Sequence, residues 1–126
     1  MEPQKMENLL AMSGEERFGY FVRKVADFEE VWSLFRDGWA TAADDTGTLL
    51  AAFWPEEDLA SVCAQESWVK YVPKSIPLEA FMHKWIPGME RDGVNVAVFP
   101  TPTGKGVVVT ASFLGNAIQE ELDELQ

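Results

Sequence analysis

The residues that come nearest to a phosphate-binding motif are Gly104 and Lys105, in the segment VFPTPTGKGVVVTA. A Walker-type loop needs a glycine five positions before the Gly-Lys pair, a Ser or Thr directly after the lysine, and a following helix. Here those two positions hold Phe99 and Gly106, and the residues that follow have the composition of a strand. The segment therefore predicts a hairpin. Pro100 ends its first strand, Gly104 or Gly106 takes a positive φ angle, and Lys105 points into solvent.

Nucleophilic catalysis could use only Cys63 and His83, the single cysteine and the single histidine of the chain. A thiolate nucleophile needs a base beside it. Cys63 shares the apolar face of its predicted helix with Leu59 and Val62, which is typical of a buried thiol. His83 follows Glu79 by four residues and is expected at the exposed rim of a helix. The sequence therefore designates no catalytic residue.

Metal-ligating residues are too few, or spaced differently from known motifs. A structural zinc site needs several Cys or His ligands, and the chain has one of each. The acidic clusters DDTG and PEED, beginning at Asp44 and Pro55, lack EF-hand spacing. They are better explained as a turn and as the negative first turn of a helix. We predict no metal and no cofactor.

A basic and aromatic segment is the most informative candidate for binding. The stretch WVKYVPK interleaves aromatic rings with lysines, and a further lysine of the predicted hairpin is expected near it; the candidate residues are Trp68, Lys70, Tyr71, Lys74 and Lys105. Such a group could bind an anionic ligand, or an acidic or aromatic segment of a partner. The same pattern also fits solvated lysines whose stems cover a core of aromatic rings.

The charge of the 126-residue chain restricts its partners. The net charge is −11, which argues against nucleic acid and against anionic membrane surfaces. No stretch approaches the roughly 20 apolar residues of a membrane span, and the N-terminal segment lacks the apolar run of a signal peptide. A single cysteine suits a reducing compartment. We therefore expect a cytoplasmic protein without a membrane or nucleic-acid partner.

Apolar periodicity and helix caps predict the elements that must position these residues, in the order helix, three strands, two helices, two strands, helix. The spacing of Ser13 and Glu16 is that of a capping box at the first helix. Pro55 suits the first position of the second helix, and Pro87 is expected to kink or end the third. Ser112 is expected to cap the last helix.

The strand predictions place three consecutive strands in an antiparallel meander and two more in a hairpin near the C-terminus. A short edge strand is expected in the proline-rich connector between the helices. The ranges of the meander and of the edge strand are 31–36, 38–43, 48–54 and 69–72.

The segments VWSLFRDGWA and FWPEEDLA, followed by KSIPLEAFMHKWIPGMERDGVNVAVFPTPTGKGVVV, resemble a family of small bacterial proteins known only as a domain of unknown function. The resemblance covers about residues 14–125. It implies a compact α+β domain in the bacterial cytoplasm. It brings no activity, cofactor or catalytic residue.

Together these observations predict one α+β domain over residues 13–126, after a loose segment at 1–12. About five strands form a mainly antiparallel sheet, covered by about three to four helices. The absence of catalytic motifs favours a non-enzymatic protein-binding module, immunity-like or adaptor-like, with a basic partner surface or with a second copy of itself. The alternative is a small anionic-ligand-binding protein or weak enzyme that uses residues 68–105.

Overall fold

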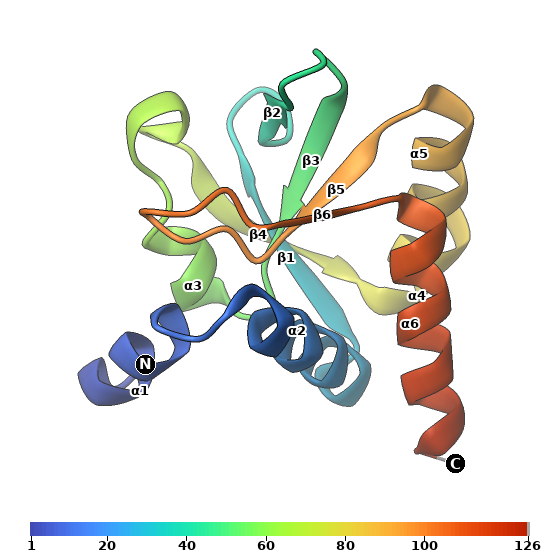
Figure 1. Cartoon of the computed structure of the whole chain (residues 1–126), viewed down its shortest axis with the longest axis horizontal. Coiled ribbons are helices and arrows are strands. Elements are labelled where there is room, and N and C mark those ends of the chain that lie inside the picture. Colours follow the sequence, from blue (N-terminus) through green and yellow to red (C-terminus); the bar gives the residue numbers. More distant parts are fainter. Residues whose placement is uncertain (126) are drawn as a thin grey trace.

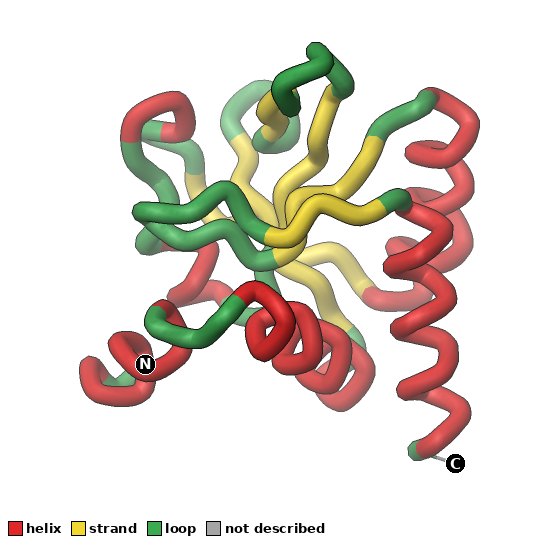
Figure 2. The backbone as a smooth tube through the Cα atoms, in the orientation of Figure 1, coloured by secondary structure: helices red, strands yellow, loops and turns green. Residues whose placement is uncertain are grey.

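The computed structural model describes residues 1–125 as one small α+β domain, in which helices surround a twisted sheet (Figures 1 and 2). The helices are α1 (Pro3–Leu10), α2 (Gly14–Phe28), α3 (Glu57–Ser61), α4 (Leu78–Ala80), α5 (Ile86–Asp92) and α6 (Ala111–Glu124). A 3₁₀ turn, η1 (Glu66–Trp68), and a π-helical segment, η2 (Phe81–Trp85), complete the helical part. The strands are β1 (Glu30–Phe35), β2 (Thr41–Ala43), β3 (Leu49–Phe53), β4 (Val72–Pro77), β5 (Asn95–Val98) and β6 (Val107–Val109). The predicted α+β class is confirmed.

The strands form two sheets. One sheet has the strand order β2-β3-β5-β6, and the other pairs β1 with β4. Neighbouring strands are antiparallel except for β3 and β5, which run parallel. Trp32 and Trp54 join the two sheets by exchanging backbone hydrogen bonds of 2.9 and 2.8 Å. In Figure 1, β1 accordingly lies beside the end of β3 at the centre of the domain.

The predicted meander is correct only for its second hairpin. β2 and β3 pair as expected around the turn at residues 44–47, but β1 meets the approach to β2 in a single bridge between Phe35 and Trp39. One edge of β1 is instead taken by β4, which lies more than 30 residues away in sequence. The edge strand expected at 69–72 is Val72–Pro77. Local strand patterns carry no signal for this distant pairing.

The N-terminal residues are helical, where the sequence analysis predicted a loose segment at 1–12. The Glu2 side chain caps α1 by accepting a hydrogen bond from the backbone N–H of Gln4. Leu9 is buried, and Met6 and Leu10 pack against the core. These three apolar residues have the i, i+3, i+4 spacing of a helix face, and their burial against the domain stabilises a helix too short to persist alone.

Helix caps are confirmed at α2 and differ at two later helices. At α2 both hydrogen bonds of the Ser13–Glu16 capping box form. α6 is capped by Thr110, whose backbone is extended and whose hydroxyl accepts from the Phe113 N–H, because Ser112 already lies inside the helix. α3 begins at Glu57 with Glu56 as its N-cap, two residues after Pro55.

The proline in the third predicted helix neither breaks nor ends it. α4, η2 and α5 follow one another without a gap over residues 78–92, and the helix ends at Gly93 with φ of 71°. Pro87 has no N–H to donate and its ring would clash in a regular α-helical turn. The π-helical segment before it accommodates the ring, with the Ile86 N–H bonded to the Phe81 carbonyl, five residues back.

Aromatic side chains dominate the centre of the core. Trp54, Phe21, Phe53, Phe81 and Phe99 are almost fully buried. Phe53 contacts Phe81 edge to face at 4.9 Å. Of the five tryptophans, Trp54 is fully buried and the other four are half-buried. Among residues 1–125, no helix has the length and apolarity needed to cross a membrane.

Candidate functional site

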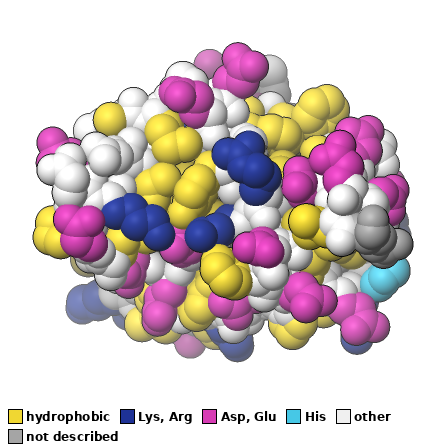
Figure 3. Space-filling model, turned by 90° about the horizontal axis from the view of Figure 1, so that it is seen from below, with side chains coloured by type: hydrophobic (Ala, Val, Ile, Leu, Met, Phe, Trp, Pro, Cys, Tyr) yellow, Lys and Arg dark blue, Asp and Glu magenta, His cyan; other side chains and the backbone are white. Residues whose placement is uncertain are grey.

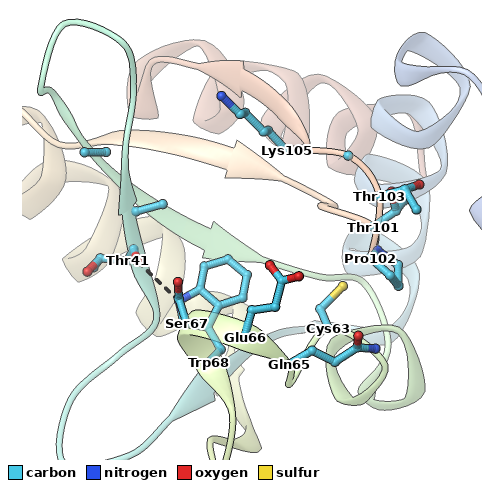
Figure 4. A pocket seen from close by; sticks show the side chains of 13 residues that line it. Thr41, Cys63, Gln65, Glu66, Ser67, Trp68, Thr101, Pro102, Thr103 and Lys105 are labelled. Atoms are coloured by element: carbon cyan, nitrogen blue, oxygen red, sulfur yellow. Dashed lines mark hydrogen bonds between the residues drawn. The ribbon is translucent and has the colours of Figure 1, made fainter.

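A cleft of about 500 Å³ lies between three segments of the chain (Figure 4). Its volume falls within the range of about 300–1,000 Å³ that is usual for ligand sites. The lining residues are those of β2, the segment around η1 (Cys63 with residues 65–68), and residues 101–105 between β5 and β6. The cleft is therefore built from parts of the chain that are far apart in sequence.

The β2 wall is held by the turn that follows it. The Asp44 carboxylate accepts hydrogen bonds from the backbone N–H groups of Thr46 and Thr48 and from the Thr46 hydroxyl. The bond from the Thr46 hydroxyl, with those from the backbone, holds the pKa of Asp44 below its usual value. This turn confirms the predicted turn at DDTG between the second and third strands, and its Gly47 has a φ of 85°. All three residues of β2 are exposed.

Trp68 forms the wall opposite β2. Its indole Nε1 donates a hydrogen bond of 3.2 Å to the carbonyl oxygen of Thr41. Its ring contacts the buried Trp54 edge to face at 5.7 Å. The turn around it has left-handed backbone at Glu66 and Lys70, with φ of 51° and 71°. Non-glycine residues adopt this conformation only where surrounding contacts impose it, so the position of Trp68 is strongly fixed.

The third wall is the hairpin predicted from the Gly-Lys segment. Thr101 and Gly104 exchange backbone hydrogen bonds of 3.0 and 3.2 Å, and Lys105 is exposed. Gly106, rather than Gly104, takes the positive φ angle, at 84°. A Cβ on Gly106 would lie 2.9 Å from the Val98 carbonyl oxygen, so glycine is required there. The hairpin prediction is confirmed, and the segment leads into a strand and not into a helix.

Cys63 lies at the bottom of the cleft beneath this hairpin. Its thiol donates a hydrogen bond of 3.3 Å to the Pro100 carbonyl oxygen, which also accepts one of 2.9 Å from the Trp54 indole. Burial raises the pKa of the Cys63 thiol to about 11. The thiol is therefore protonated at neutral pH and is a poor nucleophile. His83 is exposed and is not among the residues that line the cleft.

The chain matches a family model over residues 18–118, a span that includes all three walls of the cleft. That family is described as Protein of unknown function (DUF2750). The chain belongs to this family. The resemblance noted in the sequence is thereby confirmed for this span, and α1 lies outside it. No curated protein and no solved structure matches the chain.

Within the DUF2750 match, the structure places two of the five predicted candidate residues at the cleft and three outside it. Trp68 and Lys105 both line the cleft. Lys70 is exposed outside it, and Tyr71 is half-buried against the core. Lys74 projects from β4 over the ring of Phe35 at 4.3 Å. The lysines therefore do not converge on one anion site.

Most of the lining of the cleft was not predicted from the sequence. The hydroxyl groups of Thr41, Ser67, Thr101 and Thr103 and the amide of Gln65 lie around the cleft, and the Glu66 carboxylate projects into it (Figure 4). Polar residues in turns are common everywhere, so their types alone carry little information. The one available signal was the exposed strand Thr41–Ala43, whose small residues lack a charged or bulky side chain at a sheet edge.

An acidic groove of about 370 Å³ lies elsewhere on the domain, with Glu30, Glu56, Glu57 and Asp58 among its lining residues. Cations of the same chain already contact it, since Lys5 lies 3.7 Å from Glu56 and the Met1 ammonium pairs with Asp58.

In the view from below, basic, acidic and hydrophobic side chains alternate over the face shown, and the single histidine lies at its edge (Figure 3). On this face charge is distributed in small mixed groups.

Proposed function

We propose that the protein is a non-enzymatic binding module, adaptor-like or immunity-like, that takes a segment of a partner protein into the cleft between β2, η1 and residues 101–105. The supporting observation is the chemistry of the cleft. It offers hydroxyl, amide and backbone groups around a half-buried indole, while its thiol is held protonated by burial. Such a lining suits recognition by hydrogen bonds and aromatic contact. It does not supply an activated nucleophile.

We further propose a cytoplasmic location and a partner whose docking surface is basic. The net charge of −11 favours a cationic partner by steering the encounter. The single cysteine is buried and free, as suits a reducing compartment. The comparison with adaptor and immunity proteins rests on size, acidity and single-domain architecture, and is an analogy.

A photoreactive side chain in the cleft tests the proposal. Benzoylphenylalanine at Thr103, an exposed lining residue, should cross-link the partner in cells, and the same group at Asn116, exposed on α6, should not. The purified partner should then bind Thr103→Trp at least about tenfold more weakly than the wild-type protein, because the indole fills the cleft. Asn116→Trp should bind like wild type. A purified partner that binds both variants equally well would show that the cleft is not the binding site.

A small anionic ligand is the second candidate, because Trp68 and Lys105 both line the cleft. The Lys105 ammonium lies 3.9 Å from the Asp45 carboxylate, and Glu66 adds a negative charge to the cleft. These carboxylates oppose an anion. Phosphate, pyrophosphate and citrate should raise the melting temperature of the wild-type protein, and not of Lys105→Gln, if this candidate is correct.

A further inference from the structure

We infer that the bound segment enters the cleft as an extended strand that adds to the free edge of β2, and that it carries basic side chains. This inference rests on the proposed function and specifies its mode of binding. Strand addition uses backbone hydrogen bonds for affinity and requires an edge whose N–H and C=O groups are unpaired. The hydrogen-bond pattern around β2 shows which groups those are.

Backbone hydrogen bonds in an antiparallel pair alternate along the strand, so every second residue bonds to its neighbour and the residues between them point away. The residues on either side of β2 continue its pairing with the β3 side: the Ala40 carbonyl accepts from the Ala52 N–H, and the Asp44 N–H donates to the Thr48 carbonyl. Ala42, which lies two positions from both Ala40 and Asp44, likewise directs its backbone groups toward β3. Thr41 and Ala43 therefore direct their backbone groups away from β3.

These outward groups border the cleft. One of them, the Thr41 carbonyl, accepts the hydrogen bond from the Trp68 indole, which confirms its direction. The Thr41 N–H and both backbone groups of Ala43 have no such bond among residues 1–125 outside the β2–β3 ladder. Thr41 and Ala43 are exposed and line the cleft. Two donors and one acceptor are thus available in the spacing of a strand edge.

The free edge of β4 differs from that of β2 in its backbone donors. The Leu78 N–H bonds to the Glu29 carbonyl, so by the same alternation the residues of β4 that point away from β1 are at positions 73, 75 and 77. Two of the three are Pro73 and Pro77, which have no N–H to donate. Proline at outward positions is a common way to block an edge. β4 has this protection and β2 does not.

Charge around the β2 edge indicates the chemistry of the segment. The lining itself carries one carboxylate, Glu66, and one cation, Lys105, and Asp44 and Asp45, which follow the strand outside the lining, add two carboxylates beside its edge. This excess of carboxylates attracts a basic segment and repels a second copy of this acidic chain. β2 has three residues, so the paired part of the segment spans about three or four residues, or roughly 10 Å.

Heptapeptides that bind the wild-type protein are selected from a random phage-displayed library. Each backbone N–H of a selected peptide is then methylated in turn, and the affinity of each methylated peptide for the protein is measured. Strand addition predicts that affinity falls about two- to tenfold at the one position whose N–H bonds to the Ala43 carbonyl and is unchanged at the positions beside it, since the Thr41 carbonyl already accepts from the Trp68 indole. The selected sequences should be rich in Lys and Arg. This measurement uses the unmodified protein and does not depend on the folding of a variant.

A proline pair provides the matched control. Ala43→Pro removes an outward N–H of β2 without removing a ladder bond, and should weaken peptide binding about tenfold. Ser75→Pro makes the same change on β4 and should leave binding unchanged.

Three outcomes count against the inference in different ways. Equal binding to Ala43→Pro, with no single peptide position at which N-methylation weakens binding, overturns strand addition; if Thr103→Trp still blocks the peptide, the proposed function survives. Failure to select a peptide that Thr103→Trp excludes overturns both. A concentration-dependent dimer that Ala43→Pro abolishes would identify a second copy as the occupant, contrary to the inference.

Discussion

The indole of Trp68 donates a hydrogen bond of 3.2 Å to the carbonyl oxygen of Thr41, and so joins η1 to the edge strand β2. The same ring leans edge-on against Trp54, which is fully buried. One wall of the cleft is thereby fixed to the other and to the core. The cleft, whose walls are turns and a three-residue strand, gains a defined shape from this single side chain.

Replacing Trp68 by Phe should remove the hydrogen bond and keep most of the aromatic contact. We expect the free energy of unfolding, measured by urea denaturation, to fall by about 0.5–1.5 kcal/mol. Trp32→Phe is a matched control, because the Trp32 indole donates only to the nearby Glu30 side chain, also at 3.2 Å. Its loss should be smaller. Equal losses in the two variants would mean that the bond between η1 and β2 adds nothing to stability.

Gly106→Ala should destabilise the protein more than Gly47→Ala. The two glycines have nearly the same φ, 84° and 85°, so both variants incur a left-handed strain of about 1–2 kcal/mol. The added Cβ at Gly106 would also lie 2.9 Å from the Val98 carbonyl oxygen, whereas Gly47 has open space around it. This overlap should add about 1–3 kcal/mol. Urea denaturation of both variants measures the difference, and losses of the same size would show that the hairpin shifts without cost.

The hairpins and the capping box were predictable because each depends on residues close in sequence. Ser13 and Glu16 are three residues apart, and the glycines required by the turns stand within them. The pairing of β1 with β4 was not predictable in this way, because the Val31–Ile76 pair joins strands whose patterns are equally compatible with other partners. The π-helical segment before Pro87 was missed because a proline ordinarily signals an end.

The candidate site was predictable only in part. Trp68 and Lys105 both line the cleft, in agreement with the expectation that a lysine of the hairpin lies near the basic and aromatic segment. Lys74 instead lies over the ring of Phe35, where its ammonium interacts with the aromatic face and its stem covers apolar surface. The free edge of β2 depends on which residues bond to β3. That information lies in the register of the sheet and not in the identity of Thr41 or Ala43.

The thiol of Cys63 should titrate far above neutrality. Its pKa of about 11 predicts that alkylation by iodoacetamide at pH 8 is more than about a hundredfold slower in the folded protein than in urea. In the folded state the rate should rise steeply between pH 9 and 11. A folded-state rate at pH 8 near that of the unfolded chain would contradict the assigned protonation and reopen the case for a nucleophile.

The same raised pKa links Cys63 to stability at alkaline pH. The folded state retains the proton over a range where the unfolded chain has lost it, so the free energy of unfolding is highest below about pH 8.5 and falls as the pH approaches 11. Cys63→Ala should remove this part of the pH dependence. Burial of Tyr20 and the hydrogen bond from its hydroxyl to Glu56 also raise the pKa of that hydroxyl. In the wild-type protein and in Cys63→Ala alike, Tyr20 should therefore lower the free energy of unfolding further at higher pH.

The cap of α6 provides a direct test of where the last helix begins. Thr110→Ala removes the hydroxyl that accepts from the Phe113 N–H at 3.1 Å, and should lower the free energy of unfolding by about 1 kcal/mol. Ser112→Ala replaces an exposed residue inside the helix by a better helix former and should change stability by less than about 0.5 kcal/mol. Thermal and urea denaturation of the two variants would decide between the residues. A larger loss for Ser112→Ala would mean that the helix begins two residues later, at the position that the sequence pattern favoured.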